Sequence, residues 1–145
     1  MSYSEPVKLS VKSDYAARAM MGLARRYPSG EIVNAVDLSR EYGVPANFLV
    51  QILLELKAHK LVTSVRGKEG GYRLARPPAE LTLGDVLRAI HGQVFDSPAL
   101  ADAECPVELR NAWKRLQGTL EETAGSITFQ QLLDEGAEKQ KMYYI

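Results

Sequence analysis

The stretch between Asn34 and Lys60 constrains the fold of this chain more than any other feature of its 145 residues. The short run AVDLSREY follows Asn34, whose side chain is a favoured helix cap, and it ends at Gly43. Pro45 then suits the first turn of a second helix, PANFLVQILLELKAHK, because a proline leaves no orphaned N–H there. The broad apolar face of this second helix contains Phe48, Leu49, Ile52, Leu53 and Leu56. A short helix, a tight turn with a glycine and a longer helix form the helix-turn-helix pattern.

A basic β-hairpin is predicted directly after this pattern. Two runs rich in strand-forming residues, LVTSVR at 61–66 and YRLA at 72–75, flank the glycine-rich stretch GKEGG. Arg66, Lys68 and Arg73 place three cations on or beside the hairpin. A helix-turn-helix followed by such a hairpin is the winged-helix arrangement.

The other predicted elements are mostly helical. We expect a helix over 8–27 that Pro28 stops, followed at Ile32 and Val33 by a very short strand or an extended entry to the next helix. After the hairpin we expect a helix over 82–92 that Thr82 and Asp85 cap and a loop over 93–106. A long helix over 107–124, a short helix over 126–135 and a loosely held tail over 139–145 complete the chain. The fold class is therefore mainly α with a small β-hairpin wing. We expect a winged helix-turn-helix domain at 1–80, a connecting helix with a sensor-like loop at 81–106, and a dimerisation helix with a C-terminal tail at 107–145.

The long helix carries an apolar stripe at coiled-coil spacing. Its members are Leu109, Trp113, Leu116 and Leu120. A lone amphipathic helix must bury its stripe against another surface. Two interpretations are equally consistent with the sequence: the helix folds back on its own core, or it pairs with its twin in a homodimer.

The formal net charge of zero conceals two oppositely charged halves. Residues 1–76 contain 12 basic and 7 acidic residues, a difference of +5, whereas residues 77–145 contain 6 and 11, a difference of −5. Such an asymmetry indicates a surface in the first half that binds an anionic partner.

Nucleic acid is the anion that this pattern favours. The N-terminal side chains of the second helix of such a motif reach base edges in the major groove, and both Asn47 and Gln51 can hydrogen-bond adenine. A hairpin can enter the adjacent minor groove, whose negative potential favours cations such as Arg66. Taken singly, Gln51 is also consistent with a solvated helix residue and GKEGG with a simple turn. The predicted DNA-binding residues are Ala46, Asn47, Val50, Gln51, Arg66, Gly67, Lys68, Gly70, Gly71 and Tyr72.

Other classes of protein fit less well. No apolar stretch approaches the roughly 18 residues of a transmembrane helix, and no signal-peptide core is evident. The single cysteine excludes an internal disulfide and suits a reducing compartment, so we expect a cytoplasmic protein. Neither His59 nor His91 accompanies a catalytic or nucleotide-binding motif, so we expect no catalytic residues and no enzyme.

Four segments resemble the Rrf-two (Rrf2) family of bacterial transcription regulators, the relatives of the IscR and NsrR repressors. They are KLSVKSDYAARAMMGLA at 8–24, VPANFLVQILLEL at 44–56, LVTSVRGKEGGYRLARPP at 61–78 and LTLGDVLRAIHG at 81–92. The wing motif RGxxGGYxLA is the most specific of them, and CPVELRNAWKRLQGTL resembles the family's ending. The resemblance implies a homodimeric repressor whose long helix crosses between subunits and which binds near-palindromic, double-stranded promoter DNA.

Two departures from the family pattern limit what the resemblance implies. Cluster-binding members carry three cysteines before the long helix, whereas this chain retains only Cys105, with Asp14 matching a ligand that some members supply from the partner subunit. An iron–sulfur cluster needs several thiolates, so we expect no cluster, no metal site and no other cofactor. Some members also place a glutamate at Val50, so the operator sequence does not transfer.

Several alternatives stay open at this point. Cys105 is a candidate sensor, as a thiol switch or as a ligand of haem or an atypical cluster. The signal can instead be a partner protein or a small effector. In a further alternative, the winged helix is a protein-interaction module that does not bind DNA.

Overall fold

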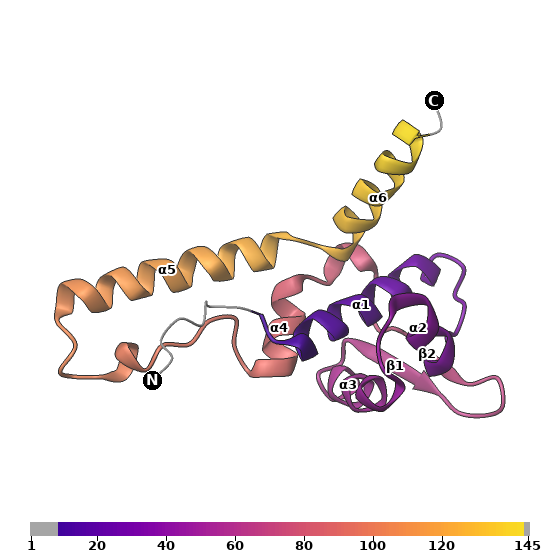
Figure 1. Cartoon of the computed structure of the whole chain (residues 1–145), viewed down its shortest axis with the longest axis horizontal. Helices are drawn as coiled ribbons and strands as arrows, with labels where there is room; N and C mark the ends of the chain where they lie inside the picture. The colour runs from indigo at the N-terminus through magenta and orange to yellow at the C-terminus, as the bar shows by residue number, and fades with distance from the viewer. Residues whose placement is uncertain (1–8, 144–145) are drawn as a thin grey trace.

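The computed structural model describes residues 9–143, and its elements follow in the order expected of a winged helix-turn-helix protein (Figure 1). The elements are α1 Val11–Arg26, α2 Ala35–Tyr42, α3 Ala46–Ala58, β1 Val62–Val65, β2 Gly71–Leu74, the short 3-10 helix η1 Pro78–Glu80, α4 Leu83–His91, the short 3-10 helix η2 Pro98–Ala101, α5 Val107–Ser126 and α6 Phe129–Tyr143. No helix in the described range is long and apolar enough to cross a membrane.

Helix α2 begins and ends where the cap residues predict. The Asn34 side chain accepts a hydrogen bond of 2.8 Å from the backbone N–H of Asp37 and so satisfies one orphaned donor of α2. Gly43 ends α2 with φ +66°, a left-handed conformation that glycine adopts without a steric penalty. The capping box of Thr82 and Asp85 at the start of α4 is also confirmed.

The structure corrects three predicted boundaries. Ser10 caps α1, which therefore begins at Val11 rather than at residue 8, and residue 8 lies outside the described range. Pro45 is the N-cap of α3 rather than a member of its first turn, because its ψ of 135° is extended. Within the predicted loop 93–106, residues 98–101 form η2.

The last helix is longer than the sequence predicts. The prediction of a short helix over 126–135 followed by a loose tail is wrong, because α6 runs from Phe129 to Tyr143. Gly136 does not stop the helix: a glycine inside a helix costs only about 1 kcal/mol, and strong helix formers follow it. Residues 144–145 of the predicted tail lie outside the described range.

One hydrophobic core joins the helix-turn-helix to the other elements. It contains the buried face of α3 together with Met20 and Leu23 of α1, Leu38 of α2 and Leu74 of the wing. The predicted short strand at Ile32 and Val33 is a single bridge, in which Val33 and Tyr72 exchange two backbone hydrogen bonds of 2.8 and 2.9 Å. This bridge ties the wing to the start of α2.

The root of α6 also belongs to this core, although it comes from the end of the chain. Phe129 is fully buried, and its backbone N–H donates to the carbonyl of Leu81 at 3.0 Å. The Leu83 N–H donates to the carbonyl of Ile127 in the same way, also at 3.0 Å. The predicted division at residues 80 and 106 stays a prediction, but the core of the first segment contains a side chain of the third.

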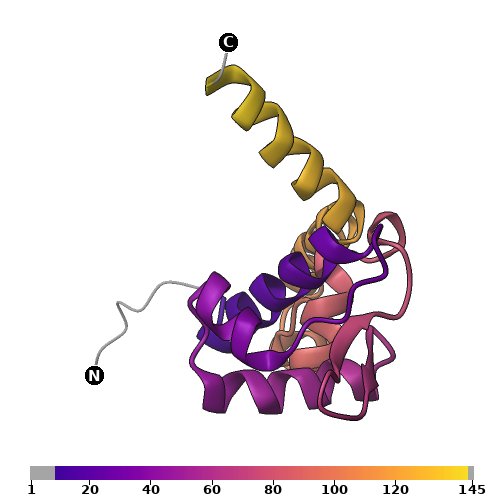
Figure 2. The same ribbon diagram turned by 90° about the vertical axis from the view of Figure 1, so that its right-hand side faces the viewer.

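Helix α5 forms an arm that extends away from this core. The chain leaves α4, runs outward through η2 and returns along α5, whose C-terminal end lies near α4 (Figure 1). Helix α6 then projects from the body in another direction (Figure 2). The described chain does not fold the arm back on its own core.

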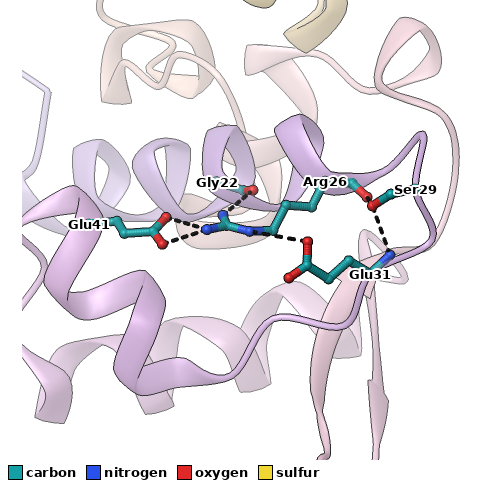
Figure 3. Close-up of polar contacts among 5 residues, drawn as sticks. All are labelled: Gly22, Arg26, Ser29, Glu31 and Glu41. Carbon is teal, nitrogen blue, oxygen red and sulfur yellow. Dashed lines mark hydrogen bonds and ion pairs between the residues drawn. The ribbon is translucent and has the colours of Figure 1, made fainter.

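An arginine on α1 holds α2 in place (Figure 3). The Arg26 guanidinium donates to a carboxylate oxygen of Glu41 at 2.6 Å and to the carbonyl of Gly22 at 3.2 Å, and its Nε lies 3.8 Å from Glu31. The hydrogen bond with Glu41 raises the pKa of Arg26, and the same bond lowers the pKa of Glu41. Helix α2 and the segment leading to it are therefore both tied to α1.

We expect Glu41→Gln to lower the melting temperature near neutral pH and to matter less as the pH falls. The pKa of Glu41 in the folded state lies below its ordinary value of 4.5, so the pair stabilises the fold fully above that value. The stabilisation is lost as the pH falls through the lowered pKa. Thermal melts by circular dichroism at a series of acidic pH values measure this, with Glu135→Gln on the exposed face of α6 as the control. A difference from wild type that stays constant with pH would contradict the prediction.

Candidate nucleic-acid interface

One face of α3 is buried and the opposite face is free. Leu49, Ile52, Leu53 and Leu56 have no exposed surface. The predicted contact residues Ala46, Asn47, Val50 and Gln51 are all exposed, with 51% of Val50 accessible. Leu54 shares this free face with 56% of its surface exposed, although the sequence analysis placed it neither on the apolar face of the helix nor among the contact residues. The helix therefore presents its predicted residues outward, as a helix that enters a groove must.

The wing is a two-stranded antiparallel hairpin at the predicted place in the chain. Val62 pairs with Leu74, and Val65 pairs with Gly71. Arg66 and Lys68 are exposed at the tip, where Gly67 has a φ of +116°. Tyr72 is half-buried against the core, so its side chain supports the hairpin more than it reaches outward.

The two adjacent glycines of the wing are required by contacts within the protein. A Cβ atom on Gly70 would lie 2.2 Å from the carbonyl oxygen of Val65, and one on Gly71 would lie 2.4 Å from that of Val33. No real Cβ atom sits so close to a backbone oxygen. The glycines of the RGxxGGYxLA motif are therefore required by packing within the protein. A side chain at either position would collide with the backbone carbonyl of Val65 or Val33.

Ion pairing concentrates the positive charge on one part of this domain. Five of the six acidic residues between 9 and 76 pair with cations of α1 and α2, and the exception is Glu69 in the wing. Four of these pairs lie within or between α1 and α2 or their connection, and the fifth joins Lys12 to Glu55 at 2.7 Å. Among the described residues, the cations of the wing and of the C-terminal end of α3 have no carboxylate partner.

A surface hollow between α3 and the wing collects three of these cations. Lys57, Lys60 and Arg66 line it together with the hydroxyl-bearing Thr63 and Ser64, and no acidic residue lines it. Lysine ammonium, guanidinium and hydroxyl groups are donors to phosphate oxygens, so we name this hollow the cationic hollow. The sequence reasoning did not single out Lys57 and Lys60, although their place at the end of the second predicted helix, just before a basic hairpin, was a signal.

Lys60 is held in an uncommon backbone conformation. Its φ is +62°, and it is the one non-glycine residue in the described chain with a positive φ. The left-handed conformation costs a residue with a side chain roughly 1–2 kcal/mol, and helix ends usually place glycine there. A lysine at this position therefore adds charge to the cationic hollow at an energetic cost.

Most of the described chain matches one family. The Rrf2 family model, described as "Iron-dependent Transcriptional regulator", matches residues 9–135. The chain belongs to the Rrf2 family. It is therefore a DNA-binding transcriptional regulator with a winged-helix fold rather than an enzyme, and the predicted fold class is confirmed.

Individual Rrf2 relatives agree with this assignment. Rv1287 of Mycobacterium tuberculosis carries a name of the HTH-type transcriptional regulator kind. It is 40% identical to this chain over 119 residues, which cover 79% of this chain and 73% of the relative. The HTH-type transcriptional regulator CymR of Bacillus subtilis is 29% identical over 96% of this chain and all of its own. Among solved structures, IscR of T. potens has a TM-score of 0.77 and 30% identity, covering 95% of this chain and 97% of its own.

The iron-dependent description of the Rrf2 family does not fit the ligands that this chain offers. Cys105 is its single cysteine, half-buried just before α5, where the Arg110 guanidinium donates to the carbonyls of Cys105 and Asp102 at 2.9 and 2.7 Å. No group of three or more His, Cys, Asp or Glu residues converges anywhere in residues 9–143. One thiolate does not hold an iron–sulfur cluster.

Proposed function

We propose that this Rrf2 regulator is a homodimeric repressor of transcription that binds promoter DNA. In this proposal α3 lies in the major groove and the wing lies in the adjacent minor groove. The observation that carries the proposal is the cationic hollow, because it joins the C-terminal end of α3 to the exposed Arg66 of the wing. A DNA backbone passing between a major-groove helix and a minor-groove wing would bring phosphates to that position. Asn47 and Gln51 then meet adenine edges in the groove.

The arm supports the homodimer. Leu109, Leu116 and Leu120 are 44, 43 and 40% exposed, and Trp113 is half-buried. A stripe of this spacing on a helix that leaves its own core is typical of a surface that packs against a second helix. A two-fold dimer presents two recognition helices, which suits half-sites about 34 Å apart along the duplex.

We further propose that the regulator works without a resident iron–sulfur cluster. The single thiolate and the lack of a converging ligand group in residues 9–143 support this. The relative CymR is described as a global cysteine regulator, and a structure of Staphylococcus aureus CymR is described as an oxidised form. A signal carried by a partner protein or a small effector fits the present chain.

One prediction from this proposal concerns phosphate contacts. We expect Lys60→Gln to weaken binding to all duplexes alike and to reduce the slope of log K against log salt by about 0.9, because one phosphate contact is lost. Fluorescence anisotropy at several salt concentrations measures this on a duplex from the region upstream of the chain's own gene and on an unrelated duplex of equal length. Lys139→Gln on α6 is the matched control. A wild-type affinity that does not fall with salt would overturn the proposed function.

A second prediction concerns the arm. We expect the double substitution Leu116→Glu and Leu120→Glu to give monomers in light scattering, since four charges would meet in the interface of the dimer. Asn111→Glu with Arg115→Gln changes the net charge equally on the opposite face of α5 and should leave the dimer intact. Dimers that persist in the first variant would remove the stripe from the interface.

The third prediction concerns the cofactor. We expect protein purified without oxygen to be colourless and free of iron, and to bind the upstream duplex in that state. Absorption spectroscopy with metal analysis measures the first property, and anisotropy measures the second. A visible chromophore whose removal abolishes DNA binding would contradict the cluster-free proposal.

A further inference from the structure

Leu54 is unlike the other leucines of α3. Leu49, Leu53 and Leu56 are fully buried, whereas 56% of Leu54 is exposed. An isolated exposed leucine needs no explanation, but its position matters here. It lies four residues after Val50 and seven after Asn47, so all three lie on the free face of the helix.

The free face of α3 consists of two parallel rows of side chains. Residues four apart stand one above the other on a helix, so Asn47 and Gln51 form a polar row. Val50 and Leu54 form an apolar row beside it, with 51% and 56% of their surfaces exposed. Neither apolar side chain belongs to the core of the described chain, so both keep their methyl groups available to a partner.

These two rows match the two chemical features of an A·T base pair in the major groove. Adenine offers a donor and an acceptor that an asparagine or glutamine amide can pair with, and thymine offers a methyl group that an apolar side chain can contact. Four residues span about 6 Å along a helix, which is close to two base-pair steps of roughly 3.4 Å. Members of a row can therefore contact base pairs two steps apart.

We propose that Leu54, together with Val50, reads thymine methyl groups, so that this regulator selects A·T pairs through methyl contacts as well as through hydrogen bonds. This inference rests on the proposed DNA binding. A protein partner would also cover an apolar row, but the row lies on the same helix as Lys57 of the cationic hollow, which fits a polyanion. Leu54 is thus a specificity-determining residue to which the sequence analysis assigned no role.

Deoxyuridine tests the proposal, because it keeps every hydrogen-bonding group of thymidine and lacks only the methyl group. The probe is the tightest-binding duplex that wild-type protein enriches from a pool of randomised DNA. Each thymidine of this duplex is replaced in turn by deoxyuridine, and affinity is measured by anisotropy. We expect a loss of about fourfold at each thymine that meets Val50 or Leu54, the value of burying one methyl-sized group.

Two variants assign the methyl contact to its side chain. In Leu54→Ala we expect the loss of affinity caused by deoxyuridine to disappear at one thymine position of each half-site and to persist at the others. In Val50→Ala we expect this loss to disappear at a different thymine position. Alanine is the best helix former, so an exposed site in α3 tolerates it, and circular dichroism checks the fold. Leu54→Met, which keeps an apolar side chain of similar size, should retain the penalty.

The outcomes separate this proposal from the one on which it rests. Salt-dependent DNA binding with no deoxyuridine penalty would overturn methyl readout and leave the proposed function standing. A penalty that is unchanged in Leu54→Ala would overturn the role of Leu54. A protein that binds no DNA at any salt concentration would overturn both.

Discussion

The rest of the structure depends on the burial of one face of α3. Four apolar side chains on this face have no exposed surface, and they fix the rotation of the helix about its own axis. Because a helix cannot bury one face without presenting the opposite one, the same packing turns Asn47, Val50, Gln51 and Leu54 toward solvent. Stability and recognition therefore use the two sides of one thirteen-residue helix.

The second constraint is the distribution of ion pairs. Apart from Glu69, the carboxylates of residues 9–76 neutralise cations on α1 and α2, and in doing so they brace the helix-turn-helix through contacts such as Arg26 with Glu41. The cations of the wing and of the end of α3 keep their full charge. A modest excess of positive charge over 76 residues thus becomes a local field beside the recognition helix.

Local signals predicted the winged helix well. Asn34, Gly43 and Thr82 mark helix ends by chemistry that depends only on near neighbours, and the structure places the helix ends where these residues indicate. The misses concern features that short-range patterns leave undecided. The predicted last helix ended before Gly136, although the strong helix formers after this glycine carry α6 on to Tyr143. The helical period left Leu54 off the apolar face of α3, but it did not show that more than half of this side chain is exposed beside Val50.

The site shows the same division between local and distant information. Exposure of Asn47 and Gln51 follows from the helical period, so the sequence sufficed for them. The cationic hollow is built from the end of α3 and from β1 with its following turn, and a linear count of charges does not show that the nearby carboxylate of Glu55 is paired with Lys12. The sequence motif identified the two glycines of the wing. Only the three-dimensional structure shows why no side chain fits there, because the backbone carbonyls of Val33 and Val65 occupy the space.

The burial of Phe129 has a consequence for how the protein is made. This side chain completes the core of the winged helix-turn-helix domain, yet 128 residues precede it in the chain. During synthesis the helix-turn-helix, the wing and α4 all emerge before the residue that seals their shared core. A nascent or truncated chain that stops short of it leaves apolar surface around Leu81 uncovered. The core of the DNA-binding domain is therefore complete only when the chain has passed the arm and reached Phe129.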